Sequence, residues 1–186
     1  MKTITYTGKE IDINDICIED ICIEDIAHSL SMQCRYNGHI NQFYSVAEHS
    51  YLVNKLVGLQ TKEIDYKLLL TALLHDATEA YIGDIIRPIK IAIPELAHIE
   101  QIIWKQIAIK FDLPKIMPEE ILESDHVLLE IEKAFFRKTD KEKVSLELIF
   151  TVTPSLKNCL SPEQAELKFL EQYHRLTEII NEKKTK

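Results

Sequence analysis

The sequence predicts an all-α protein, and three observations support that prediction. Apolar residues recur at helical spacing through most of the 186 residues, while alternating, strand-like patterns are confined to the first dozen. Hydrophobic residues make up 46% of the chain and charged residues 28%, which is typical of a globular domain with its own core. The four glycines and six prolines are scattered along the chain. We therefore expect a single domain over residues 1–186.

The first strong helix signal begins at Ser45. This serine can cap the N-terminus of a helix over "VAEHSYLVNKLV", and Glu48 three residues later would complete a capping box. His49 then lies in the first turns of this helix.

A second helix is expected over residues 63–83. Its leucines form an apolar face, and Gly83 supplies the usual stop signal. The adjacent pair His75 and Asp76 falls near the middle or the C-terminal part of this helix.

Prolines and polar runs divide the second half of the chain. A helix over 94–111 begins at a proline, and two further prolines precede a helix over 119–136 that carries Asp125. The polar segments 137–143 and 153–164 are expected to be loops. A final amphipathic helix is expected over about residues 161–182, opened by a Ser-Pro pair and followed by a frayed tail.

The pentad ICIED occurs twice in succession, at residues 16–20 and 21–25. A shift of five residues matches neither the 3.6-residue period of a helix nor the two-residue period of a strand. We therefore expect that both copies cannot present the same face. The acidic pairs lack the glycine-containing loop of an EF-hand, so a local duplication without chemistry is the favoured interpretation.

Composition excludes several classes of function. The net charge of −8 disfavours a nucleic-acid-binding surface, which needs clustered lysine and arginine. No apolar run approaches the roughly 20 residues of a membrane span, and the N-terminus lacks the apolar centre of a secretory signal. We expect a cytoplasmic protein without membrane attachment. The cysteines show no metal-binding spacing and are interpreted as buried or idle thiols: Cys17, Cys22, Cys34 and Cys159.

Four residues on three predicted helices have the chemistry of metal ligands. His49, His75, Asp76 and Asp125 offer two imidazoles and two carboxylates, a set suited to a first-row divalent ion. Asp76 follows the apolar run "LLTALLH", where a charge is costly without a cation or hydrogen-bond partners. The sequence therefore predicts one divalent metal ion. Ligand type alone leaves Mn, Co, Fe, Zn and Mg open.

The same residues carry a resemblance to a known family. The pattern from His49 through His75-Asp76 to Asp125, with "LLHDATEAYIGDIIRP" at its centre, resembles the H…HD…D signature of the HD-domain metal-dependent phosphohydrolases. "IEDIAHSLSMQCRYNGH", "FYSVAEHS" and "SDHVLLEIE" are similar to the branch with bacterial 5′-deoxynucleotidases and phage deoxynucleoside triphosphate hydrolases. The resemblance covers about residues 12–136 and implies a compact HD-domain helical bundle around one metal ion. The resemblance also implies a homo-oligomer of undetermined size, because such relatives often form dimers or larger homo-oligomers.

The resemblance also implies roles for individual residues. The four residues above would bind the metal, Glu79 would help to activate the attacking water, and Asp84 would orient that water or the leaving oxygen. A divalent cation polarises a phosphoryl group and lowers the pKa of a bound water, so a nearby carboxylate can complete its deprotonation near neutral pH.

Substrate contacts follow from the same resemblance. Arg35 would clamp phosphate, and Arg87 and Lys90 could supplement it on a longer phosphate chain. Tyr36 stands where the 5′-deoxynucleotidases typically have a tryptophan that screens the sugar. It could stack on a base or sugar, but selectivity for deoxyribose is left open. His39, beside a turn glycine, could contact the substrate or serve only in the loop.

The function expected from the sequence is hydrolysis of phosphate from a small-molecule nucleotide, with a deoxynucleotide favoured and monophosphate or triphosphate open. One alternative is a non-catalytic nucleotide-binding protein on the same scaffold. Another is an HD-type phosphodiesterase of a signalling nucleotide. That class includes two-metal sites with additional histidines, whereas His98, His126 and His174 are isolated in this sequence.

Overall fold

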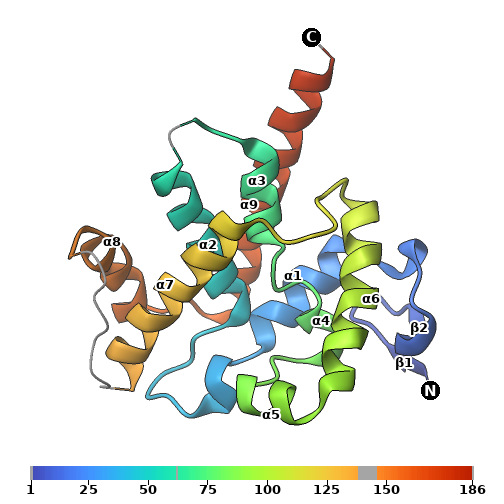
Figure 1. Ribbon diagram of the computed structural model, residues 1–186, viewed down its shortest axis with the longest axis horizontal. Coiled ribbons are helices and arrows are strands. Elements are labelled where there is room, and N and C mark those ends of the chain that lie inside the picture. The colour runs from blue at the N-terminus through green and yellow to red at the C-terminus, as the bar shows by residue number, and fades with distance from the viewer. Residues whose placement is uncertain (1, 62, 138–145, 186) are drawn as a thin grey trace.

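The computed structural model describes residues 2–61, 63–137 and 146–185, and it confirms the all-α prediction (Figure 1). The α-helices of the described residues are α1 (Ile23–Met32), α2 (Val46–Gln60), α3 (Tyr66–Leu73), α4 (Glu79–Ile82), α5 (Arg87–Ala92), α6 (Pro94–Lys110), α7 (Glu119–Phe136), α8 (Leu146–Lys157) and α9 (Pro162–Lys184). Three 3₁₀ helices accompany them: η1 (Ile13–Asp15), η2 (Ile18–Asp20) and η3 (Arg35–Gly38).

The strand-like pattern at the N-terminus forms a small antiparallel hairpin. It joins β1 (Lys2–Ile4) to β2 (Glu10–Asp12), with Thr3 opposite Ile11. Ile11 is buried against the helices, while all of β1 is exposed. The hairpin therefore lies at the edge of the helical body (Figure 1).

The repeated pentads present equivalent faces, so the expectation that they could not was wrong. Ile16 and Ile21, the first residues of the two copies, are both buried in the same apolar cluster. Cys17 and Cys22 each stand at the N-cap of a helix, η2 and α1 respectively. The period argument fails because the chain bends between the copies, and each copy begins a helix of its own.

The predicted cap of α2 is only half correct. The Ser45 hydroxyl accepts a hydrogen bond from the backbone N–H of Glu48 at 3.1 Å, as a capping serine should. The Glu48 carboxylate instead accepts from the backbone N–H of Leu160 at 2.9 Å. This contact ties the start of α2 to the segment that leads into α9.

The single helix predicted over 63–83 is wrong, because α3 and α4 are separated by turns at residues 74–78. The sequence contains no breaker there. Leu74 and Ala77 are both fully buried in the core, whereas His75 and Asp76 face the other way, toward α2 and α7. The turns allow these neighbouring residues to point in opposite directions. Tertiary packing has overridden local propensity. Gly83 ends α4 as expected, with a φ of 87°.

Helices α6 and α7 confirm the segments predicted between the prolines, but the segment predicted as a loop over 153–164 is partly helical. Residues 153–157 belong to α8, despite Pro154 inside it, because Val152 and Leu156 pack into an apolar cluster with α2 and α7. Ser161 caps α9 in a capping box with Gln164, and this helix continues beyond the expected tail start. Of the loop predicted over 137–143, residues 138–143 lie outside the described residues.

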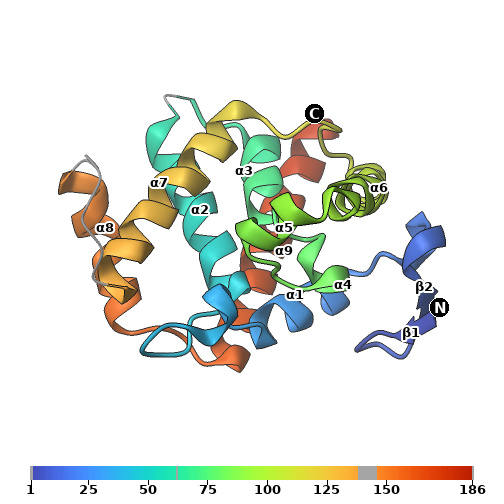
Figure 2. The same cartoon turned by 60° about the horizontal axis from the view of Figure 1, so that its bottom comes forward.

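Two apolar clusters form the core. The first lies between α1, α3, α6 and α9, the second between α2, α7 and α8. Helix α9 packs against α1, α2 and α3, so it runs through the body of the molecule (Figure 2). Helix α2 contributes residues to both clusters, and the predicted metal ligands lie where it meets α3 and α7. In the described ranges, no helix has the length and apolar character needed to cross a membrane.

Replacement of Phe169 tests whether α9 is part of the domain. Phe169 is fully buried in the first cluster, so Phe169→Ala should lower the free energy of unfolding by about 3–5 kcal/mol. Phe150 on α8 is 74% exposed, and Phe150→Ala should change it by less than about 0.5 kcal/mol. Chemical denaturation of both variants checks this. Equal, small effects would show that α9 is an appendage.

Candidate metal centre

Three side chains from three elements converge at one point. His49 projects from the second turn of α2, His75 from the turn after α3, and Asp125 from α7. One ligand atom from each lies within 4.8 Å of the other two. The Oδ1 atom of Asp125 is 2.9 Å from Nε2 of His49 and 3.9 Å from Nε2 of His75. The structure thus brings together residues that are 26 and 50 positions apart in the sequence.

The histidine nitrogens indicate what the cluster can hold. Nδ1 of His75 lies 2.9 Å from the carbonyl oxygen of Ala72, and Nδ1 of His49 lies 2.7 Å from a carboxylate oxygen of Glu132. Both Nε2 atoms are buried and have no hydrogen-bond partner among the described residues. Two unpartnered imidazole nitrogens beside a carboxylate fit a first-row divalent ion.

Asp76 lies at the edge of this cluster. Its Oδ1 is 3.3 Å from Nε2 of His75, and its Oδ2 is 3.7 Å from Nε2 of His49. The same Oδ2 is 3.7 Å from Nη1 of Arg35. Asp76 is therefore in place to complete the predicted ligand set and to face the predicted phosphate clamp.

The electrostatics of the cluster favour a positive charge at its centre. Burial and Arg35 lower the pKa of His49, but Glu132 and Asp125 outweigh them and raise it to about 10. Burial alone would raise the pKa of Asp125, yet its contact with His49 and the charges around it hold that pKa below the usual range. A dication would supply the charge that this arrangement attracts.

Glu132 is the site residue that the sequence analysis missed. It is fully buried on α7, and it accepts hydrogen bonds from Tyr36 and Tyr44 as well as from Arg35. Burial would raise its pKa, but Arg35 and His49 bring the pKa down to about 2. A usable signal was its position seven residues, or two helical turns, after Asp125, which places both on one face.

Arg35 and Tyr36 are both committed to this buried network. The guanidinium of Arg35 contacts Glu132 through Nε at 3.3 Å and Nη2 at 3.2 Å. Tyr36 has a φ of 59° and is 9% exposed, and its hydroxyl donates to Glu132 at 2.8 Å. Contact of Tyr36 with a base or sugar stays a prediction. His39 is exposed just after η3, and its contact with substrate is likewise untested.

A cavity of about 670 Å³ opens beside the cluster and extends to α6. Glu79 and Lys90 line it together with His75, Asp76 and Asp125. Its far wall, on α6 and residues 115–117, comprises Ala97, Glu100, Gln101, Trp104, Lys105, Lys115, Ile116 and Met117, and Thr78 and Leu122 complete the lining.

Glu79 is the buried carboxylate of this cavity. Its Oε1 is 3.1 Å from Nζ of Lys90, while its Oε2 is buried without a hydrogen-bond partner in the described part of the chain. Burial, followed by the charges of Asp76 and Asp84, raises the pKa of Glu79 well above its ordinary value. Lys90 also pairs with Glu100 at 2.6 Å.

The remaining predicted residues, Asp84 and Arg87, do not line the cavity, although the charge of Asp84 helps to raise the pKa of Glu79. Asp84 is not part of the cavity lining, and burial raises the pKa of its carboxyl. Arg87 is exposed on α5 and does not contribute to the described lining. Gln33 fixes the segment that carries both carboxylates: its amide nitrogen donates to the carbonyl of Glu79, and its amide oxygen accepts from the backbone N–H of Asp84.

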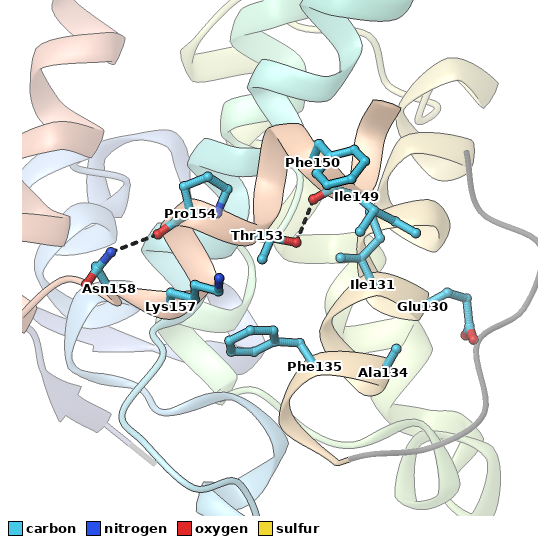
Figure 3. A pocket seen from close by; sticks show the side chains of 10 residues that line it. All are labelled: Glu130, Ile131, Ala134, Phe135, Ile149, Phe150, Thr153, Pro154, Lys157 and Asn158. Atoms are coloured by element: carbon cyan, nitrogen blue, oxygen red, sulfur yellow. Dashed lines mark hydrogen bonds between the residues drawn. The ribbon is translucent and has the colours of Figure 1, made fainter. Parts of the chain in front are cut away.

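A second cavity of about 630 Å³ lies between α7 and α8 (Figure 3). Its walls are largely apolar, with Ile131, Phe135 and Phe150 prominent, and it shares no lining residue with the cavity at the metal cluster. None of the predicted metal-binding, catalytic or substrate-binding residues lines it.

The fold and the cluster define an all-helical protein with a histidine–aspartate metal centre. The sequence profile of the HD domain matches residues 29–186. Two curated proteins are similar, both named only as uncharacterized: YfdR of Escherichia coli (strain K12), 34% identical over 94% of this chain and 95% of its own, and RCAP_rcc00048 of Rhodobacter capsulatus, 39% identical over 62% and 60%. The chain belongs to the HD domain family, whose members are typically metal-dependent hydrolases.

Metal binding can be measured without a substrate. Mn²⁺ or Zn²⁺ at 100 times its dissociation constant should stabilise the metal-free protein by about 2.7 kcal/mol, because binding favours the folded state. His75→Ala removes a ligand and should abolish most of this gain, whereas His98→Ala, at an exposed position, should retain it. Thermal unfolding with and without metal is the measurement. Equal stabilisation of both variants would place the ion elsewhere.

Proposed function

We propose that this protein is a metal-dependent phosphohydrolase that removes phosphate from a nucleotide, with a deoxynucleotide favoured. The observation that carries the proposal is Glu79 Oε2, a buried carboxylate oxygen without a partner among the described residues, in a cavity lined by three of the predicted metal ligands. A protein that only binds nucleotide has no need for a buried proton acceptor at this position.

The residues divide the reaction between them. His49, His75, Asp76 and Asp125 would hold the ion, which supplies Lewis acidity toward the phosphoryl group when bound. Glu79 would take the proton of the attacking water at its free oxygen, while Lys90 holds its other oxygen.

Arg35 and Asp84 complete the proposed machinery. Arg35 would bind the phosphate through Nη1, since Glu132 already contacts its Nε and Nη2. Asp84 would orient the water or the leaving oxygen, from a segment that Gln33 fixes.

The cavity wall on α6 supports a nucleotide as the substrate. The Trp104 indole offers an aromatic surface and a buried N–H without a partner among the described residues. Met117 and Leu122 add apolar surface next to it. Such a mixture of aromatic, apolar and hydrogen-bonding groups suits a nucleobase better than it suits a small sugar phosphate.

Glu79→Gln tests the proton-acceptor role. The amide cannot accept the proton, so kcat should fall by about 10²–10⁴-fold while Mn²⁺ affinity stays within about twofold. Release of phosphate or polyphosphate from a panel of nucleoside and deoxynucleoside mono-, di- and triphosphates, resolved by chromatography, is the measurement. Glu95→Gln, at an exposed position on α6, is the matched control. Wild-type turnover that Glu79→Gln leaves intact would refute the assignment.

The number of phosphates can be tested on the cavity lysines. Lys105 and Lys115 are exposed at its rim, and in this acidic protein they would contact distal phosphates. If the substrate is a triphosphate, Lys105→Ala/Lys115→Ala should raise KM for triphosphate about tenfold more than KM for monophosphate, whereas Lys110→Ala outside the cavity should not. Equal changes would favour a monophosphate substrate.

The two alternative functions give different results in the same assay. A non-catalytic binding protein would bind nucleotide tightly and release no product with any divalent ion. A phosphodiesterase would cleave cyclic or otherwise diesterified signalling nucleotides in preference to the terminal phosphates of the panel. The metal cluster of the described residues contains only the two histidines, which favours a single ion over a two-metal phosphodiesterase site.

A further inference from the structure

We infer that Glu132 is the positioning residue of the metal centre: one carboxylate selects the imidazole tautomer of His49 and fixes the orientation of Arg35. The inference rests on the proposed function, because it concerns the metal and the phosphate of that site. Nothing in the family signature includes this glutamate.

The contact with His49 determines which nitrogen is available. Oε1 of Glu132 lies 2.7 Å from Nδ1 of His49, deep in the protein. An ionised carboxylate only accepts hydrogen bonds, so Nδ1 must carry the hydrogen. A histidine must be neutral to bind a metal, and in the neutral ring the lone pair is then on Nε2, the atom that faces Asp125 and has no hydrogen-bond partner in the described chain.

The second oxygen of Glu132 orients the predicted phosphate clamp. Oε2 contacts Nε and Nη2 of Arg35, which are on one edge of the planar guanidinium. Nη1 faces Oδ2 of Asp76 at 3.7 Å, on the side of the metal cluster. Arg35 therefore keeps the donors of Nη1 directed toward Asp76, at the edge of the cluster that would hold the ion.

Two tyrosines hold the carboxylate itself in place. Tyr44 donates to Oε1 at 2.7 Å, and Tyr36 donates to Oε2 at 2.8 Å. Each oxygen thus has one tyrosine and one functional side chain as partners. Since the same carboxylate orients both His49 and Arg35, its loss should weaken metal binding and phosphate binding together. If Glu132 only formed a structural ion pair with Arg35, its loss would leave metal binding unchanged.

The experiment compares Glu132→Gln with Glu130→Gln. Glu130 is on the same helix, pairs with Lys133 at 2.6 Å and lines the other cavity, so it controls for the change in charge. The amide can donate to Nδ1 and so favours hydrogen on Nε2. Zn²⁺ affinity, measured by chelator competition on metal-free protein, should fall 10–100-fold in Glu132→Gln and stay unchanged in Glu130→Gln.

Phosphate binding provides the second readout. On zinc-saturated protein, Glu132→Gln and Arg35→Ala should each lower the affinity for inorganic phosphate, and the double variant should lose little more than Arg35→Ala alone. A folded Glu132→Gln, judged by circular dichroism, with wild-type Zn²⁺ affinity would overturn the inference.

A measurement on the wild type keeps the inference testable if Glu132→Gln does not fold. Long-range ¹⁵N–¹H NMR of the zinc-loaded protein should show the His49 ring hydrogen on Nδ1 and the metal on Nε2. The opposite arrangement would overturn the inference. Failure of the wild type to bind any divalent ion would refute the proposed function and this inference together, whereas Zn²⁺ binding with equal affinity in folded Glu132→Gln would refute the inference alone.

Discussion

The burial of the Glu132 carboxylate is the constraint on which the arrangement of the site depends. A charged group without exposure to water is costly unless its oxygens are satisfied, and here the donors come from η3, from the segment before α2, and from α2 itself. Each of these segments must be in place for the carboxylate of α7 to be buried. The packing of α2 against α7 that buries this carboxylate therefore also brings His49 next to Asp125. The second apolar cluster, between α2, α7 and α8, supplies the hydrophobic free energy that offsets the cost of the buried charge.

The sequence predicted the parts of the fold that local signals encode. Ser45 and Ser161 mark helix starts, Gly83 marks an end, and the two histidines and Asp125 meet as their pattern indicates. The break between α3 and α4 and the helix through Pro154 could not be predicted, because both follow from which side chains the core buries. Glu132 was missed for a related reason: in the run "LEIEKAFF" charged residues alternate with apolar ones, and glutamate and lysine are usually exposed. The seven-residue spacing from Asp125 distinguishes it from Glu130, and the burial of Glu132 on α7 confirms that distinction.

The charge distribution explains how an acidic protein can favour an anionic substrate. Asp76, Glu79 and Asp125 face the cavity, and burial together with the charges of Asp76 and Asp84 raises the pKa of Glu79. A dication among the ligands would reverse the sign of the local potential, and the few cations nearby would then act with it. Lys90 is held by two carboxylates and serves mainly to fix Glu79 in place. In the proposed function, the attraction for phosphate would thus be concentrated at the bound ion, at Arg35 and at the lysines of the rim.

In the proposed function, metal binding and substrate recognition are carried by different elements. The ligand cluster belongs to α2, the turn after α3, and α7, whereas the far wall of the cavity belongs to α6 and residues 115–117. Substitutions at Trp104 or Lys115 would change the surface offered to a substrate without moving a metal ligand. Membership of the HD domain family therefore indicates metal-dependent hydrolysis as the class of chemistry, and in the proposed function the substrate depends on α6. For this reason the residues of that wall carry more information about the substrate than does the metal-binding signature.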